Sequence, residues 1–337
     1  MCLPGNEHDP LMRGDEAMTY LRGTTFTEQT AVAELTLDAV RPWPAPAQEE
    51  PGYISGFVRS AKTTLAPAAV REFFVRLYAT DRLLHNFGWL LLLSVPAFAL
   101  LSYLDPGTAR FANPWFKPIK FAISFATFVW TVSLFLTRLR ISGRLLNWTR
   151  LTMTASVVVE MLCLAIQASR IANQTATSGF ADWLIQQMTT AMVSINTAIL
   201  IGLFAFFCGK RDRIRIADGA MVLAIRLSIL IFLAGNAVGG YMLARGSHTV
   251  GAADGGPGLP FLNWSTIGGD LRIAHFIAIH AIQIVPLFAY LVWQMTPQPS
   301  LKYRRVAVYA VAAFTALLVG GTFVQAMLAQ PVIALVR

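Results

Sequence analysis

Seven long apolar segments follow residue 80, and they limit what this chain can fold into more than any other feature. They cover residues 83–104, 119–137, 151–169, 188–208, 219–243, 271–295 and 304–329. A helix rises about 1.5 Å per residue, so each segment can cross a hydrocarbon layer of about 30 Å. None alternates apolar and polar residues as the strands of a membrane barrel do. The sequence therefore predicts an all-α, polytopic bundle of about seven transmembrane helices within residues 83–329.

The charge content agrees with a membrane protein. Only 13% of the residues are charged, whereas soluble domains carry about 25%. This deficit excludes a soluble enzyme and a nucleic-acid-binding protein with a continuous basic face. The predicted partner is the lipid bilayer, and no nucleic-acid partner is expected.

Two segments precede the bundle. Residues 1–66 begin with nine acids against three arginines in the first 50 residues and contain several prolines, which predicts a disordered acidic tail that has a possible cytoplasmic partner. Residues 67–82 place apolar side chains at helical spacing opposite charged ones, which predicts an amphipathic helix at the membrane surface. Its apolar residues are Val70, Phe73, Phe74, Leu77 and Tyr78.

The basic residues between the segments predict the orientation. The second, fourth and sixth connections contain eleven Lys and Arg residues, and the first, third and fifth contain six. Cytoplasmic loops carry the excess of positive charge in membrane proteins. The N-terminus is therefore expected in the cytoplasm and the C-terminus outside.

Glu160 is the only acid expected in a membrane core. An ionisable group there costs about 2.5–3.5 kcal/mol on insertion scales and is a candidate functional group. The residues that share its helix face are spaced 4, 3, 4 and 3, which predicts one polar stripe facing other helices. This stripe contains Ser156, Glu160, Cys163, Gln167 and Arg170.

Glu160 has three interpretations. Arg226, in the fifth segment, lies at a similar depth by helix rise, so the two charges could form a buried ion pair that locks two helices together. Alternatively, Glu160 serves a ligand or proton site. In the third interpretation, Arg226 extends toward the inner lipid headgroups and leaves Glu160 protonated and alone.

The sixth segment carries a second polar face. His280 and Gln283 lie on it, and His280 lies near the depth of Glu160. His280 is either part of a ligand site or a hydrogen-bonded helix contact. His275 lies about 140° away around the helix, so it cannot share a metal ion with His280 without distortion. Asp270 is placed to cap the helix N-terminus.

A glycine-rich connection, residues 244–269, precedes the sixth segment and is expected to be a flexible outer loop or lid. His248, Asp270 and His275 are weak candidates for a metal site beneath it. In the fifth segment, Gly235 and Gly239 form a GxxxG packing face, and Asn236 marks a possible helix irregularity.

Two stretches, NPWFKPIKFAISFATF and GGDLRIAHFIAIHAIQ, resemble segments of uncharacterised bacterial multi-pass inner-membrane proteins. The resemblance covers about residues 83–329. It implies a bacterial inner-membrane location and no particular activity.

Three functions remain open. The favoured one is binding and translocation of a small ligand or a proton through a polar site in the bundle. The alternatives are an outer-facing membrane enzyme or redox protein that depends on a metal or haem, and an assembly or scaffold protein. No specific cofactor is implied, and whether the protein is an enzyme stays open. The candidate site residues are Glu160, Gln167, Arg226, Asn236, His280 and Gln283.

Overall fold

The computed structural model describes residues 67–105, 113–172, 179–216, 218–295 and 300–333, and all of these residues belong to one compact unit. The predicted acidic tail, residues 1–66, lies outside the described residues.

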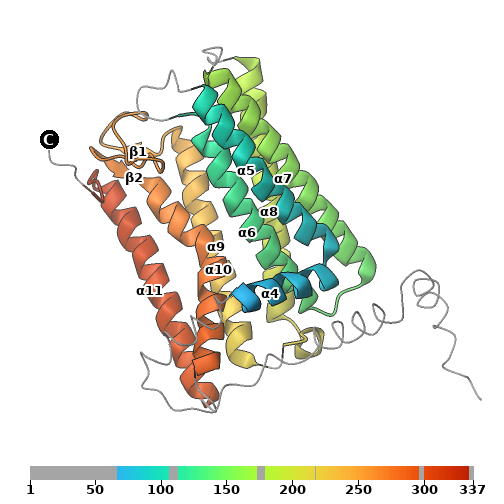
Figure 1. The fold of residues 1–337 in the computed structure, drawn as a ribbon. Helices are drawn as coiled ribbons and strands as arrows, with labels where there is room; N and C mark the ends of the chain where they lie inside the picture. Colours follow the sequence, from blue (N-terminus) through green and yellow to red (C-terminus); the bar gives the residue numbers. More distant parts are fainter. Residues whose placement is uncertain (1–66, 106–112, 173–178, 217, 296–299, 334–337) are drawn as a thin grey trace, which may run out of the picture. The chain divides into compact units, whose positions relative to one another are not determined.

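Seven helices of the described part are long and apolar enough to cross a membrane (Figure 1). This confirms the predicted all-α bundle and the order of its segments. The helices are α5 (Arg82–Leu104), α6 (Phe116–Thr137), α7 (Gly143–Ala172), α8 (Phe180–Cys208), α9 (Gly219–Arg245), α10 (Leu271–Met295) and α11 (Leu301–Met327).

Several predicted boundaries are wrong. The second segment was expected to begin at Ile119, but α6 begins at Phe116 and includes Lys117 in its first turn. Pro118 does not prevent this, because the first N–H groups of a helix have no carbonyl partner within it. The helices α7 and α8 also begin about two turns before the expected residues 151 and 188, because their first turns are polar or amphipathic.

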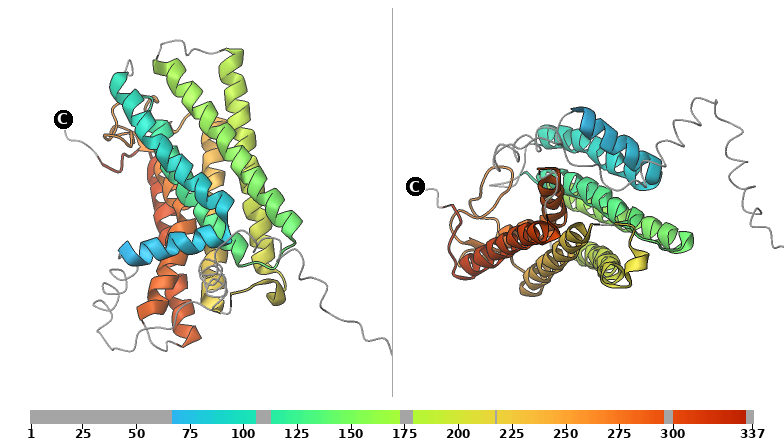
Figure 2. Two further views of the ribbon diagram at one scale, coloured as in Figure 1. Left: turned by 45° about the vertical axis from the view of Figure 1, so that its right-hand side comes forward. Right: turned by 90° about the horizontal axis from the view of Figure 1, so that it is seen from below.

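A short helix, α4 (Pro67–Thr80), lies across the direction of the spans (Figures 1 and 2). Its Leu77 is buried, as expected for an amphipathic helix. It ends at Thr80 instead of residue 82, because the Asp81 side chain accepts a hydrogen bond from the Leu84 N–H and caps α5.

Asp81 also joins this corner to two other helices. Its Oδ2 accepts hydrogen bonds from the Ser133 hydroxyl on α6, at 3.0 Å, and from Arg150 Nε on α7, at 2.8 Å. The side chain of Asp81 is 1% exposed. A buried ion pair therefore fixes α4, α5, α6 and α7 at one end of the bundle.

The centre of the bundle is α6. Of its most apolar 18-residue window, 56% is buried, against 44% or less in the other spans. It contacts α5 and α7 on one side and α10 on another. Polar side chains on α6 are therefore placed among other helices.

The helices α9 and α10 pack closely because of glycine. A Cβ atom at Gly235 would lie 2.6 Å from the Ala278 Cβ, and one at Gly239 would lie 3.0 Å from the His275 ring. This confirms the predicted packing face on α9.

The connection between α9 and α10 folds into a cap (Figure 1). Its two short strands, β1 (Thr249–Val250) and β2 (Gly269–Asp270), pair antiparallel, with Thr249 opposite Asp270. A Cβ atom at Gly269 would lie 2.0 Å from the Ala326 carbonyl oxygen, so the cap packs directly on the end of α11. The expected flexible loop is instead a hydrogen-bonded structure.

Candidate functional site

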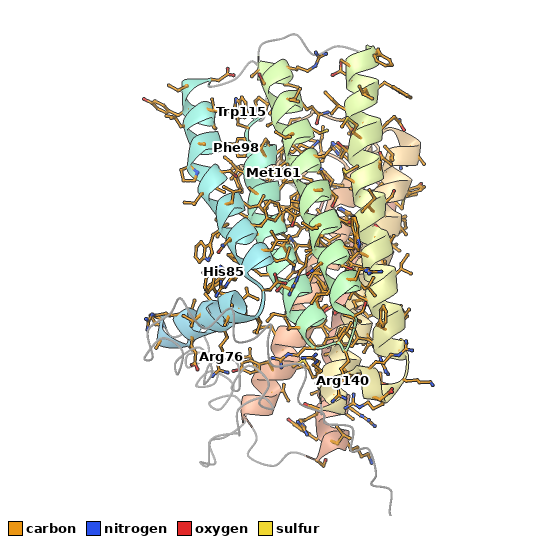
Figure 3. All side chains as sticks on the ribbon, turned by 90° about the vertical axis from the view of Figure 1, so that its right-hand side faces the viewer. Arg76, His85, Phe98, Trp115, Arg140 and Met161 are labelled. Carbon is orange, nitrogen blue, oxygen red and sulfur yellow. The ribbon has the colours of Figure 1, made fainter. Side chains whose placement is uncertain are left out.

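Glu160 lies inside the bundle on α7. Its residue is 2% exposed, and Ser156 and Cys163 on the same face are also buried. This confirms that the predicted stripe faces protein there. Figure 3 labels the next residue, Met161, between Trp115 toward one end of the bundle and Arg140 toward the other. The Glu160 Oε2 atom is buried and has no hydrogen-bond partner in the described part of the chain.

Lys117 on α6 is the cation that acts on Glu160. Lys117 is the charged group that acts on Glu160, and Glu160 acts on Lys117 more strongly than Arg272 does. The attraction between the carboxylate and the ammonium favours the ionised form of both groups. The Lys117 ammonium also donates a hydrogen bond of 2.9 Å to Gln167 Oε1, two turns along α7 from Glu160. Glu160, Gln167 and Lys117 therefore form one polar group between α6 and α7, which we call the Glu160 site.

The structure does not bring Arg226 to Glu160. Arg226 donates from Nε, at 2.8 Å, and from Nη2, at 2.5 Å, to the carbonyl oxygen of Phe207. That carbonyl lies in the last turn of α8, where helix carbonyls lack partners. The predicted ion pair is therefore wrong: Arg226 binds the end of a neighbouring helix, and its extension toward the headgroups stays a prediction.

Two further polar contacts of α8 join it to neighbouring helices. The Ser156 hydroxyl donates to Asn196 Oδ1 at 3.0 Å, across α7 and α8. The Asn236 amide donates to the Thr197 hydroxyl at 2.7 Å, across α9 and α8. Asn236 lies within a continuous helix, so the predicted irregularity is wrong. These contacts satisfy polar groups that hydrocarbon would leave unpaired.

The histidines of α10 have different surroundings. His275 Nδ1 lies 2.8 Å from the Gly235 carbonyl oxygen, in the groove that the α9 glycines create. His280 contacts the Phe276 ring at 4.5 Å between centroids. His280 Nε2 and Gln283 Oε1 are buried without a hydrogen-bond partner in the described part. One polar atom each of His280, Gln283 and Glu160 is therefore buried without a hydrogen-bond partner in the described part.

Asp270 and Asp254 hold the cap together. Asp270 accepts hydrogen bonds from the Arg272 and Ser265 backbone N–H groups and forms a two-pronged pair with the Arg272 guanidinium. This confirms its predicted role at the start of α10. Burial raises the pKa of Asp270, but Arg272 and these hydrogen bonds outweigh burial and bring the pKa below its usual value.

The His248 side chain interacts with Asp254 and Thr249 within the cap. Its Nδ1 lies 3.3 Å from Asp254 Oδ1 and 3.1 Å from the Thr249 hydroxyl. Burial, followed by the charge of Arg272, lowers the pKa of His248. Among the described residues, no three His, Cys, Asp or Glu side chains gather as a metal-binding group. His248, Asp270 and His275 each bind a different partner, so the geometry does not support the predicted metal site.

Lys117 is the site residue that the sequence interpretation missed, because Lys117 and Lys120 were counted as loop residues. A signal was present: Lys117, Lys120, Ser124, Thr127 and Thr131 are spaced 3, 4, 3 and 4 and share one helix face. This is the spacing that identified the stripe on α7.

The fold and its lipid-length apolar helices define a multi-pass transmembrane protein. No protein-family model, curated protein or solved structure matches the chain. The buried polar groups of the bundle, above all the Glu160 site, are therefore the basis for a functional proposal.

Proposed function

We propose that the protein binds a small ligand or a proton inside the bundle and moves it across the membrane, with Glu160 as the protonatable group. The observation that carries the proposal is the buried Oε2 of Glu160, which has no donor in the described part although Lys117 lies near enough to attract it. Buried carboxylates that serve only structure are normally paired and hydrogen-bonded.

The contrast with other polar groups supports this proposal over a scaffold role. Arg226, Asn236, Ser156 and His275 each have a hydrogen-bonding neighbour on another helix. Glu160, His280 and Gln283 each retain a buried polar atom without one. Free hydrogen-bonding capacity inside a membrane protein is costly, and a ligand, a proton or water can satisfy it.

The same proposal includes the membrane in which the protein lies and its orientation there. The eleven Lys and Arg residues in the even-numbered connections favour a cytoplasmic N-terminus and an outer C-terminus, in the inner membrane of a bacterium. In that orientation the cap and Lys117 face the outside. Glu160 then lies deeper in the bundle than Lys117, which binds Gln167 two turns nearer the outer end of α7.

Proton flux tests the proposal. The full chain is reconstituted in liposomes of phosphatidylethanolamine and phosphatidylglycerol. A pH dye inside the liposomes records proton flux under an imposed pH gradient. The recording is made with and without phosphate in the outer solution. We expect flux from the wild type and none above protein-free liposomes from Glu160→Gln. Cys163→Ala, one turn away on the same buried face, is the matched control and should retain flux. A wild type without flux, or an unchanged Glu160→Gln, overturns the proposal.

A further inference from the structure

Three cations gather where α6 and α10 begin. Lys117 and Lys120 lie one turn apart on α6. Lys120 Nζ donates to the carbonyl oxygens of Phe261, at 3.1 Å, and Leu262, at 3.3 Å. Arg272 donates to the carbonyl oxygen of the next residue, Asn263. Three successive cap carbonyls therefore hold Lys120 and Arg272 side by side, with Lys117 one turn from Lys120.

The positive charge of this cluster is only partly balanced. Asp270 neutralises Arg272, to which it is bound through both oxygens. Lys120 and Lys117 donate hydrogen bonds to uncharged oxygens, those of the cap carbonyls and of Gln167. The three cations also act on one another, since Arg272 repels both lysines. Glu160 is the acid whose negative charge acts on Lys117. When Glu160 is protonated, the charges of Lys117 and Lys120 therefore lose this compensation.

The cluster is open to a ligand. The side chain of Lys117 is exposed, and those of Lys120 and Arg272 are partly exposed. The helices α6 and α10 also begin here, and helix N-termini carry positive partial charge. The two lysine charges and the two helix N-termini attract an anion, while the carboxylates of Asp270 and Glu160 oppose it.

We propose that Lys117, Lys120 and Arg272 form the entry site for a small oxyanion, phosphate or a carboxylate, under the cap. Lysine ammonium groups bind such anions as point charges. This inference rests on the proposed function and names its ligand class. An anion beside Lys117 competes with Glu160 for the ammonium, so anion binding is accompanied by proton uptake at Glu160.

Calorimetry on the purified full chain in a non-ionic detergent tests the site. Inorganic phosphate and acetate are titrated at constant ionic strength. We expect saturable binding that weakens at least tenfold in Lys117→Gln and in Lys120→Gln, while Lys117→Arg stays within about threefold of the wild type because the charge is kept. Arg245→Gln is the matched control, since Arg245 lies at the same end of the bundle over the Tyr241 ring and outside the cluster.

A second arm distinguishes a free anion from a lipid headgroup. Phosphatidylglycerol or phosphatidylcholine is added to the detergent micelles before the titration. Phosphate binding in lipid-free detergent supports a free anion, whereas binding of phosphatidylglycerol alone, lost in Lys117→Gln, supports a headgroup. The proposal is overturned if neither binds, or if Lys117→Gln and Arg245→Gln bind like the wild type.

The two proposals fail separately. We expect Glu160→Gln to lose proton flux and to keep phosphate binding, now without proton uptake. Loss of flux in Glu160→Gln together with normal phosphate binding in Lys117→Gln would refute the anion site and leave the proposed function standing. Phosphate binding that depends on the cluster, in a protein that shows no proton flux, would refute the proposed function and leave the anion site standing.

Discussion

The partner of Glu160 can be identified by double-mutant cycles, because the two candidate cations should behave differently. Arg226→Met removes two hydrogen bonds to the Phe207 carbonyl. A hydrogen bond from a charged group contributes about 1.5–3 kcal/mol. Because both donors share one acceptor, we expect Arg226→Met to lower the free energy of unfolding by about 2–3 kcal/mol. This loss should add to that of Glu160→Gln within about 0.5 kcal/mol, since the sites share no partner.

Lys117 should be coupled to Glu160. No ion pair of 4.0 Å or less joins the two among the described residues. At an effective dielectric constant near 20, the attraction at such a separation is below about 4 kcal/mol. Lys117 is exposed and exposed pairs are weak, so we expect a coupling energy of about 1 kcal/mol between Glu160→Gln and Lys117→Met.

Chemical unfolding of the purified protein in detergent measures both cycles, with helical circular dichroism as the probe. Rescue of Glu160→Gln by Arg226→Met, with a coupling of about 2 kcal/mol or more, would refute the structural reasoning. So would the absence of coupling to Lys117.

Three further outcomes are expected. Asp81→Ala leaves the partly buried Arg150 without its counter-charge and should cost about 3 kcal/mol in chemical unfolding, at the lower end of the range for buried pairs. The additional change Arg150→Met should recover part of the loss, whereas full additivity would contradict the ion pair. Gly235→Leu should lower the free energy of unfolding by about 1–3 kcal/mol, because the larger side chain overpacks against Ala278. Gly202→Leu is the control and should be nearly neutral in the same assay, because nothing lies within 4 Å of an added Cβ atom there. Equal losses in the two variants would contradict the α9–α10 packing. Because the pKa of Asp270 is below its ordinary 3.8, its contribution to the cap is complete above that pH and is lost as the pH falls through the lower folded value. The protection of the Ser265 and Arg272 amides against exchange, relative to their intrinsic rates, should therefore fall in acid, and should fall less in Asp270→Asn. Equal acid sensitivity in the variant would exclude Asp270 as the cause.

Much of the fold could be predicted because apolar length is a local property. Each lipid-length segment was visible in the sequence, and the GxxxG face on α9 follows from two glycines one turn apart. The helix starts were harder. Lys117 and Lys120 interrupt the apolar pattern on either side of Ile119, yet polar first turns and Pro118 are compatible with a helix start.

The site was predictable only in part. The depth and helix face of Glu160 follow from residue spacing along α7, and the structure buries it as expected. Its partner does not follow, because helix rise gives the depth of Arg226 but not which helices are neighbours. The structure places α6 beside α7, and α9 beside α8, α10 and α11. The cap was equally hidden, since its hydrogen bonds join residues with no periodic pattern.

Infrared difference spectroscopy gives the most direct test of Glu160 as the group that exchanges a proton. Spectra of the full chain in detergent are recorded before and after addition of phosphate at fixed pH. If Glu160 takes up a proton when phosphate binds, we expect a protonated-carboxyl band that appears with phosphate and shifts with carbon-13-labelled glutamate. The band should be missing in Glu160→Gln and present in Cys163→Ala. A band that persists in Glu160→Gln, or no carboxyl change in a wild type that binds phosphate, would contradict this role of Glu160.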